Sequence, residues 1–330
     1  MFTELATSKD LTKASLEMVV QSYVRYFAAG ASHTARAKRL DLAHFLKFLT
    51  NYRSVSKSEK LKVADWDFSS VQRFVDQALA RGEAAATVAR RLATIKHMGR
   101  SLAEKIPGFI NPAREVRGPK IKPIFPKALS TKEIANAKAS AKQRLGQRDS
   151  FIRARNQMLL EFLLDTGLRA EEVRLLKLGQ LDERYEWIAN VRTKGRRFRN
   201  VYVTSAIRDK LGAYLKLREH HLRKRFGKVT VAQNRNLPLF ISTYRAALAK
   251  PESLQMGPKS VWRAINELSA GTPLHPHLLR HSYAIDLLDS SSDIRLVAQA
   301  LGHSDVRVTM RYTERKESEI AKALEKSRRK

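Results

Sequence analysis

The 330-residue sequence contains no cysteine, which excludes disulfide bonds and thiolate metal sites. Its first residues contain no apolar segment of the kind found in secretion signals, and no hydrophobic run approaches the length that crosses a bilayer. We therefore expect a cytoplasmic protein that makes no contact with a membrane. The length and a hydrophobic content of 43% are sufficient for two domains with separate cores.

Acidic residues are scarce beside basic ones, with 32 Asp and Glu against 63 Lys and Arg, for a formal net charge of +31. Residues 1–128 contain 23 basic and 11 acidic side chains, and residues 129–330 contain 40 and 21. An excess in both halves argues against a neutral enzyme with a basic tail and favours a nucleic acid that both halves contact. This interpretation implies a nucleoid-associated protein. The alternatives are a ribosome-like scaffold or an ordinary enzyme with a basic surface.

Apolar residues recur at three- and four-residue spacing in four stretches of the N-terminal part. This periodicity predicts helices over 13–28, 34–52, 68–79 and 86–102, which together form a small helical domain. Four basic residues lie on the fourth helix: Arg90, Arg91, Lys96 and Arg100. We interpret them as contacts to a DNA backbone, with a simply solvated helix face as the alternative.

A proline-rich stretch without periodicity follows. Its prolines lie among basic residues and predict an extended linker over 111–128: Pro112, Pro119, Pro123 and Pro126. Ser130 and Glu133 then form a capping box, the pattern with which a helix begins. The predicted domains are therefore residues 1–110 and 129–330.

The C-terminal part mixes helical and strand patterns. Helices are predicted over 151–165, 168–176, 210–225, 261–268, from Pro276 onward and over 317–329. Strands are predicted over 187–191 and 199–203, on either side of a turn at Lys194 and Gly195. Residues 226–260 show no clear pattern, although 239–241 are compatible with a short strand. The expected fold class is mainly α-helical with a small β-sheet.

Several side chains of this part suit chemistry on a phosphodiester. Arg169 lies in a glycine-bounded turn at a helix entrance, and Arg280 lies three residues after His277 near another helix start. Guanidinium groups at such positions can bind phosphate oxygens bidentately. Lys194 at a hairpin tip can protonate an alkoxide leaving group. Tyr312 can attack phosphorus once neighbouring cations favour its phenolate.

Each of these residues also has an ordinary structural interpretation. His277 can cap its own helix, Arg169 can pair with Glu172, Lys194 can decorate a turn and Tyr312 can fill the core. The histidines near the start of the Pro276 helix lack a carboxylate at zinc-ligand spacing, and no GxxxxGK[S/T] run is present. We therefore expect neither a metal nor a cofactor.

Five motifs, taken together, resemble those of one known family. They are Thr166-Gly-Leu-Arg169-Ala-Glu-Glu172, the hairpin with Lys194, His277-Leu-Leu-Arg280-His281, Leu301-Gly302-His303 and Tyr312. Their order and spacing resemble those of the tyrosine recombinases, the phage-integrase family. The resemblance extends more loosely to the N-terminal domain and to Asn111-Pro112-Ala113. It implies a helical, SAM-like core-binding domain and an α+β catalytic domain that close as a C-shaped clamp around duplex DNA.

The resemblance also implies a role for each motif residue. Tyr312 would attack the scissile phosphate and form a 3′-phosphotyrosyl bond, while Arg169 and Arg280 would hold the nonbridging oxygens. Lys194 would protonate the leaving 5′-oxygen, and His277 would assist proton transfer at the tyrosine. His303 would hydrogen-bond the phosphate, Glu172 would orient the site, and Arg196 or Arg197 would contact DNA. Religation would require neither ATP nor metal.

A recombinase of this kind would act on double-stranded DNA with paired inverted-repeat sites. Four protomers would exchange strands in pairs, in integration, excision or resolution, and accessory DNA-bending proteins could assist. A tail helix at about 314–330 would dock on a neighbouring protomer or, alternatively, pack on its own domain. The rival hypotheses are a type IB topoisomerase, which shares the chemistry without a second site, and a DNA-binding regulator that has lost strand exchange.

Overall fold

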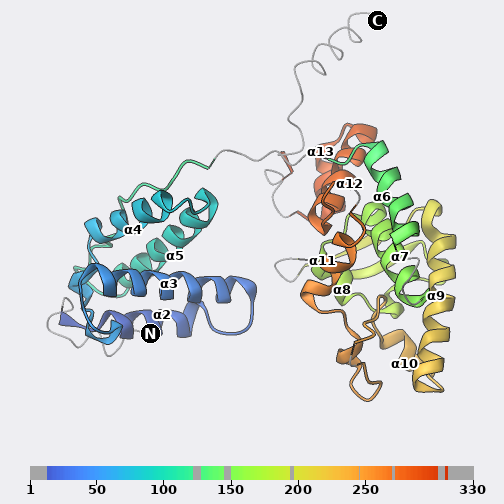
Figure 1. The fold of residues 1–330 in the computed structure, drawn as a ribbon, viewed down its shortest axis with the longest axis horizontal. Helices are drawn as coiled ribbons and strands as arrows, with labels where there is room; N and C mark the ends of the chain where they lie inside the picture. The colour runs from blue at the N-terminus through green and yellow to red at the C-terminus, as the bar shows by residue number, and fades with distance from the viewer. Residues whose placement is uncertain are drawn as a thin grey trace, which may run out of the picture. The chain divides into compact units, whose positions relative to one another are not determined.

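The computed structural model describes residues 13–121, 128–144, 150–193, 197–244, 246–269, 272–303 and 309–310, apart from the side chains of 140–144. The chain divides into two compact units, Met1–Pro123 and Ile124–Lys330. Figure 1 draws the helices of both units, and each unit has a hydrophobic core of its own. No helix in these ranges is long and apolar enough to cross a membrane.

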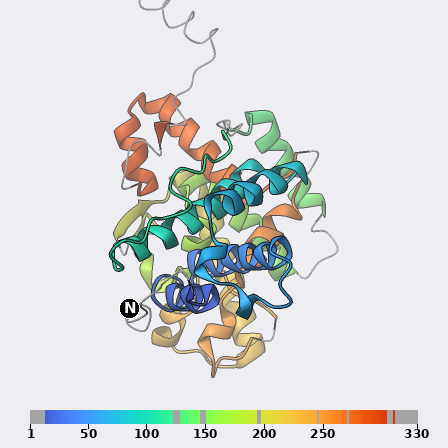
Figure 2. The same cartoon turned by 90° about the vertical axis from the view of Figure 1, so that its left-hand side faces the viewer.

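The described part of the first unit contains four α-helices. They are α2 (Leu16–Phe27), α3 (His33–Tyr52), α4 (Phe68–Ala80) and α5 (Ala85–Ala103), with the short 3-10 helices η2 (Ser58–Lys60) and η3 (Val63–Asp65) between α3 and α4. Helix α3 packs against α2, α4 and α5 and buries Leu42, Phe45 and Leu49 in the core. Both views show the α4–α5 pair on one side of the α2–α3 pair (Figures 1 and 2). The four helices predicted from periodicity are confirmed.

The segment after α5 continues to pack on the first unit. Asn111 Nδ2 donates to the Lys96 carbonyl at 3.1 Å, and Ala113 and Val116 are buried in the same core as the four helices. The first compact unit therefore extends past residue 110 to Pro123.

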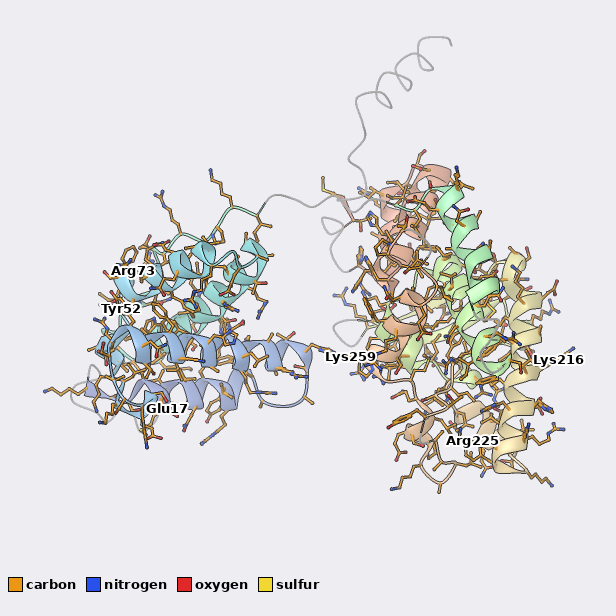
Figure 3. All side chains as sticks on the ribbon, in the orientation of Figure 1. Glu17, Tyr52, Arg73, Lys216, Arg225 and Lys259 are labelled. Atoms are coloured by element: carbon orange, nitrogen blue, oxygen red, sulfur yellow. The ribbon has the colours of Figure 1, made fainter. Side chains whose placement is uncertain are left out.

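The second unit contains the remaining described elements. Its α-helices are α6 (Thr131–Arg144), α7 (Ser150–Thr166), α8 (Ala170–Leu175), α9 (Ser205–Phe226), α10 (Val231–Asn236), α11 (Pro258–Asn266), α12 (Pro276–Ser291) and α13 (Ile294–Leu301). The 3-10 helices are η5 (Leu178–Gln180) and η6 (Pro251–Leu254), and the strands are β1 (Trp187–Arg192) and β2 (Phe198–Tyr202). Helix α7 packs against both α9 and α12 and lies between them (Figure 1). The basic helix α9 therefore lies at the periphery of this unit, and Lys216 extends outward from it (Figure 3).

Helix α6 begins as the sequence predicts. The Glu133 carboxylate accepts from the Ser130 backbone N–H at 2.8 Å, and the Ser130 hydroxyl accepts from the Glu133 N–H at 3.2 Å. These two bonds satisfy backbone donors that the helix leaves without an intrahelical partner. The predicted capping box is confirmed.

The two strands form an antiparallel hairpin. Trp187 pairs with Tyr202 and Val191 with Arg199, and the register shifts between Ile188 and Val191. Both predicted strands are confirmed, and the turn residues Lys194 to Arg196 lie outside the described residues.

Residues 226–260 differ from the sequence expectations. Residues 231–236 form α10, and 239–241 are not a strand. Instead, the Leu239 N–H donates to the Leu176 carbonyl at 2.8 Å, whereas Ile241 makes an isolated bridge with Gln255. The apolar run correctly predicts burial, since Phe240 is 1% exposed. Such a run does not show whether the backbone pairs with one neighbouring strand or with several loops.

Candidate active site

Arg169 and Glu172 are fixed together at the entrance of α8. Gly167 ends α7 with a φ of +59°, and the Tyr283 ring lies where a Cβ at this position would be, 2.3 Å from it. Only glycine fits both the left-handed turn and this close approach. Arg169 is then the N-cap of α8, and its N–H donates to Glu172 Oε2 at 2.9 Å while its Nη1 donates to Oε1 at 2.7 Å.

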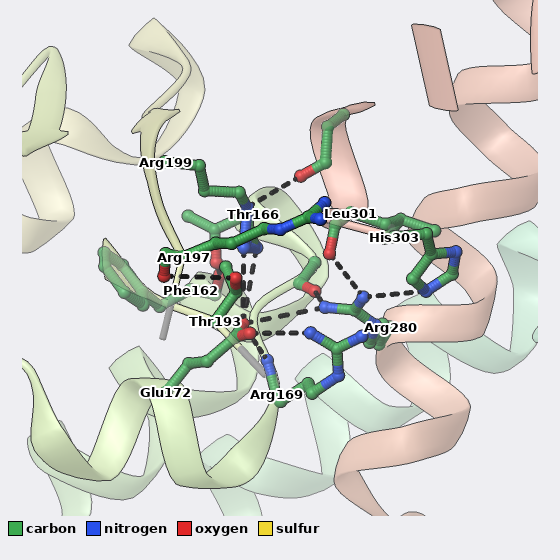
Figure 4. Close-up of polar contacts among 12 residues, drawn as sticks. Phe162, Thr166, Arg169, Glu172, Thr193, Arg197, Arg199, Arg280, Leu301 and His303 are labelled. Atoms are coloured by element: carbon green, nitrogen blue, oxygen red, sulfur yellow. Dashed lines mark hydrogen bonds and ion pairs between the residues drawn. The ribbon is translucent and has the colours of Figure 1, made fainter. Parts of the chain in front are cut away.

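Glu172 is the centre of a buried cluster of charges. The residue is 6% exposed. Besides Arg169, its Oε2 lies 3.3 Å from Arg199 Nη2 and 3.7 Å from Arg280 Nη1, so three guanidinium groups converge on one carboxylate (Figure 4). One negative charge among three positive ones leaves an excess of positive charge in a region of low dielectric. Such a region stabilises an anion more strongly than an exposed cluster does.

Arg280 is held by three acceptors from two segments of the second unit. Helix α12 begins with His275 as N-cap and Pro276 in its first turn, and Arg280 follows one turn later. Its guanidinium donates to the carbonyls of Gly167 and Leu301, both at 2.7 Å, and to His303 Nε2 at 3.1 Å. The residue is only 4% exposed, so these bonds fix its orientation before any ligand arrives.

His303 follows the left-handed turn that ends α13. Because a guanidinium only donates, His303 Nε2 accepts from Arg280, which assigns the ring proton to Nδ1. Nδ1 lies 2.8 Å from Thr309 Oγ1 and is therefore assigned as the donor to it. Thr309 is fully buried and lies three positions before Tyr312 in the sequence.

His277 lies at the exposed start of α12, a turn before Arg280. Partial desolvation of its ring, followed by the positive charges of His275, Arg280 and Arg169, lowers the pKa of His277. Its position at the positive end of the helix acts in the same direction. A lowered pKa keeps the imidazole neutral near pH 7, in the form that can accept a proton.

These contacts form a preorganised anion site. Two family models match the chain that carries it. Residues 129–319 match the phage integrase family, and residues 20–105 match the phage integrase N-terminal SAM-like domain. The chain belongs to the phage integrase family. The predicted enzyme class, a tyrosine-type site-specific recombinase, is thereby confirmed.

Relatives within the family match over most of their length. Tyrosine recombinase XerC of Pseudomonas savastanoi pv. phaseolicola is 30% identical over 284 residues, which cover 85% of each chain. XerC of Pseudomonas aeruginosa is 31% identical over 294 residues, 83% of this chain and 90% of the relative. XerH recombinase bound to palindromic difH substrate has a similar fold, with a TM-score of 0.70 at 16% identity over 97% and 98% of the two chains. The predicted mainly helical fold with a SAM-like domain and a small sheet is confirmed.

Some of the site residues predicted for this chain lie outside the residues that the structure describes. The structure brings together Arg169, Glu172, Arg280 and His303, with His277 at the start of the same helix as Arg280. Lys194, Arg196 and Tyr312 lie outside the described ranges. Arg197 is exposed, and its carbonyl accepts from the Thr193 N–H at 2.7 Å. Among the described residues, no three His, Asp or Glu side chains form a group that could hold a metal ion.

Three of the four predicted DNA-contacting residues on α5 have partners within the first unit. Arg90 pairs at 2.5 Å with Asp41, which is 1% exposed, and Arg91 pairs at 2.6 Å with Glu83. Lys96 Nζ donates to the Arg114 carbonyl at 3.2 Å. Arg100 is exposed.

Arg199 is a mostly buried member of the cluster that the motifs did not indicate. It lies in β2, its side chain is 10% exposed, and burial lowers its pKa although Glu172 opposes this effect. One sequence signal was available: Arg199 alternates with Val201 and Val203 in the predicted strand, and both valines are buried.

Proposed function

We propose that this chain is a site-specific DNA recombinase that cleaves and rejoins duplex DNA through a 3′-phosphotyrosyl intermediate. The observation that carries the proposal is the convergence of Arg169, Arg199 and Arg280 on the buried Glu172, next to His303. A phosphodiester in a pentacoordinate transition state gains negative charge on its nonbridging oxygens, and prearranged guanidinium groups stabilise that charge.

The proposed cleavage step transfers a phosphoryl group from one oxygen to another. The Tyr312 phenolic oxygen forms a bond to phosphorus, and the bond from phosphorus to the 5′-oxygen breaks. His277, which its lowered pKa keeps neutral, takes the phenolic proton, and Lys194 gives a proton to the leaving 5′-oxygen. Arg169 and Arg280 hold the nonbridging oxygens. His303 hydrogen-bonds one of them through Nε2; for this the phosphate replaces Arg280 at Nε2, the ring proton lies on Nε2, and the Thr309 hydroxyl donates to Nδ1.

Religation reverses the same step with a 5′-hydroxyl from a second strand. The phosphotyrosyl ester retains the energy of the phosphodiester, so the reaction needs neither ATP nor a metal. Glu172 orients the arginines throughout, because it contacts Arg169, Arg199 and Arg280 at once.

The partners follow from the same proposal. XerH, which shares the fold, is seen on difH DNA, and the positive charge of both parts of this chain suits the same class of partner. We propose a core-binding domain over 1–110, a linker over 111–128 whose first residues pack on that domain, and a catalytic domain over 129–330, with both domains on the duplex. Four protomers would join two inverted-repeat sites, with the 314–330 tail on a neighbouring protomer, and the protein would be found with the nucleoid. Arg100, Arg196 and Arg197 are proposed DNA contacts.

A suicide duplex tests the nucleophile. The recombination site would be selected from randomised duplexes by binding and then nicked next to the scissile phosphate, so that the cleaved fragment diffuses away. Wild type should accumulate a covalent protein–DNA product, and Tyr312→Phe should form none because it lacks the attacking oxygen. Tyr283→Phe is the matched control and should still form the product, since burial raises the pKa of Tyr283 and leaves it a poor nucleophile.

Two results would contradict the proposal. Covalent product from Tyr312→Phe would remove Tyr312 as the nucleophile. Relaxation of supercoiled DNA by wild type without any joining of two sites would favour the topoisomerase instead.

A further inference from the structure

Arg199 joins three separate segments of the second unit. From strand β2 its Nε donates to the carbonyl of Ala300 in α13 at 3.0 Å, and its Nη2 donates to Glu172 Oε2 at 3.3 Å. Its third nitrogen, Nη1, lies 3.5 Å from the same carboxylate oxygen. All three nitrogens therefore face protein acceptors, and the side chain is 10% exposed.

The base of the hairpin packs directly on the turn that precedes His303. Gly302 has a φ of +65°, and a Cβ added to it would lie 3.0 Å from Thr193 Cγ2 and 3.1 Å from Arg199 Cδ. The Thr193 N–H in turn donates to the Arg197 carbonyl at 2.7 Å, which closes the hairpin at this level. Thr193 and Arg199 therefore lie together against the turn at Gly302.

The end of α13 depends on the same arginine. A helix leaves its last carbonyls without intrahelical donors, and these carbonyls carry the negative end of the helix dipole. Arg199 and Arg280 donate to consecutive carbonyls, those of Ala300 and Leu301. Arg199 thus connects the hairpin to the C-terminal end of α13, to which the phosphate-site residue Arg280 also donates.

We infer that Arg199 is a positioning residue, which fixes Thr193, the residue before Lys194 in the sequence, relative to the phosphate site of Arg169, Arg280 and His303. The inference rests on the proposed function, in which Lys194 protonates the leaving 5′-oxygen. In this proposal Arg199 acts through the hairpin, since each of its three nitrogens faces the Ala300 carbonyl or the Glu172 carboxylate.

A change of leaving group separates this role from a general structural one. When sulfur replaces the bridging 5′-oxygen, the leaving thiolate has a conjugate acid with a pKa of about 8.5 and needs no proton donor. Cleavage of this duplex should therefore be insensitive to loss or misplacement of Lys194. The measurement is the single-turnover rate of covalent product with oxygen and sulfur suicide duplexes for wild type, Lys194→Ala, Arg199→Met, Arg199→Lys and Arg280→Met.

Arg199→Met should cleave the oxygen duplex about 10²-fold more slowly than wild type, the loss expected when a catalytic group is misplaced by about 1 Å. It should cleave the sulfur duplex at nearly the wild-type rate, as Lys194→Ala does. On the oxygen duplex the rate of Arg199→Lys should lie between those of wild type and Arg199→Met. An ammonium can reach Glu172 or Ala300 but does not reproduce the guanidinium fork. Arg280→Met should be slow on both duplexes.

Arg208→Met is the matched control. Arg208 is 21% exposed at the side chain, pairs with Glu186 at 2.8 Å and lies over the Tyr202 ring, so it supports the opposite end of β2. It should cleave both duplexes at nearly the wild-type rate.

Equal loss on both duplexes for Arg199→Met would overturn the inference, because Arg199 would then support the phosphate site alone. Full activity on the oxygen duplex would overturn it as well, and so would a Lys194→Ala variant that sulfur does not rescue. Failure of the proposed function is distinguishable from these outcomes. In that case wild type itself would give no covalent product, or Tyr312→Phe would give it.

Discussion

Glu172 supplies the negative charge that lets three arginines lie close together inside the second unit. Arg169 Nη1 donates to Glu172 Oε1. Arg199 and Arg280 both lie near Glu172 Oε2, which also accepts from the Arg169 N–H. Removing one partner from a buried set of charges costs more than the interaction itself contributes, because the remaining charges lose their compensation. The carboxylate is therefore a structural requirement of the site as well as an orienting group.

Glu172→Gln should lower the free energy of unfolding by about 3 kcal/mol, since it leaves three guanidinium groups without a buried carboxylate. Urea unfolding followed by tryptophan fluorescence measures the change. The matched control is Glu171→Gln, whose carboxylate is 53% exposed and pairs with Arg174. It should cost less than about 1 kcal/mol, as exposed pairs do. Equal losses in the two variants would show that the three arginines tolerate one another.

The lowered pKa of His277 makes a prediction about pH. The histidine must be neutral to take the phenolic proton, so cleavage should persist below pH 6.5, roughly the ordinary histidine pKa, and fall only as pH drops through the lowered value. His275→Asn retains an N-cap side chain but removes one of the charges that lower this pKa, so its acid limb should move to higher pH. Single-turnover cleavage rates between pH 5 and 8 test both statements; an unmoved limb would exclude His277 as the titrating base.

The helices and the hairpin were predictable because each carries a local signal. Periodic apolar residues gave the four helices of the first unit, and Ser130 with Glu133 gave the start of α6. Residues 239–241 were interpreted wrongly because their partners, Leu176 and Gln255, are distant in sequence and belong to no strand. Arg199 was missed for the same reason: its role depends on Glu172 and Ala300, which no local pattern connects to it.

The contact between α2 and α5 is sensitive to charge. Tyr23 Oη lies 2.8 Å from His97 Nδ1, and burial, followed by the charges of Lys38 and Arg100, lowers the pKa of His97. The unfolded chain then binds more protons than the folded one between the lowered pKa and the unfolded value near 6.5. Stability of this contact is therefore present above that window and is lost as pH falls through it.

Lys38→Met should raise the pKa of His97 towards its ordinary value, because it removes a repulsive charge. A titration of the His97 ring by NMR measures the shift. Lys47→Met alters an exposed lysine of the same helix, α3, that is not among the charges acting on His97, and it should leave the pKa unchanged. A His97 pKa that does not respond to Lys38→Met would leave burial and Arg100 as the causes of its lowered value.

On the scale of the whole molecule, the net charge of +31 implies binding that weakens steeply with salt. Counterions released from DNA phosphates make log K fall linearly with log salt, by about one unit of slope per phosphate contact. The structure distinguishes basic residues that can contact DNA phosphates from those that pair within the protein. Arg100 is exposed, whereas Arg91 pairs with Glu83.

Arg100→Ala should weaken binding to all duplex sequences alike and reduce the salt slope by about one unit. Arg91→Ala should leave the slope unchanged and lower stability instead, because its side chain is 12% exposed and paired. Fluorescence anisotropy at several salt concentrations measures both. The reverse pattern would place Arg91 on the DNA and Arg100 in a purely solvated role.

The residues around Glu172 come from α8, β2, α12 and the turn after α13, which span most of the second unit in sequence. During synthesis on the ribosome, Arg280 and His303 emerge more than 100 residues after Glu172. We therefore expect an incomplete nascent chain, or a fragment left by proteolysis before α12, to retain basic surface but to lack an assembled phosphate site. Such a product should bind DNA through its charge without cleaving it.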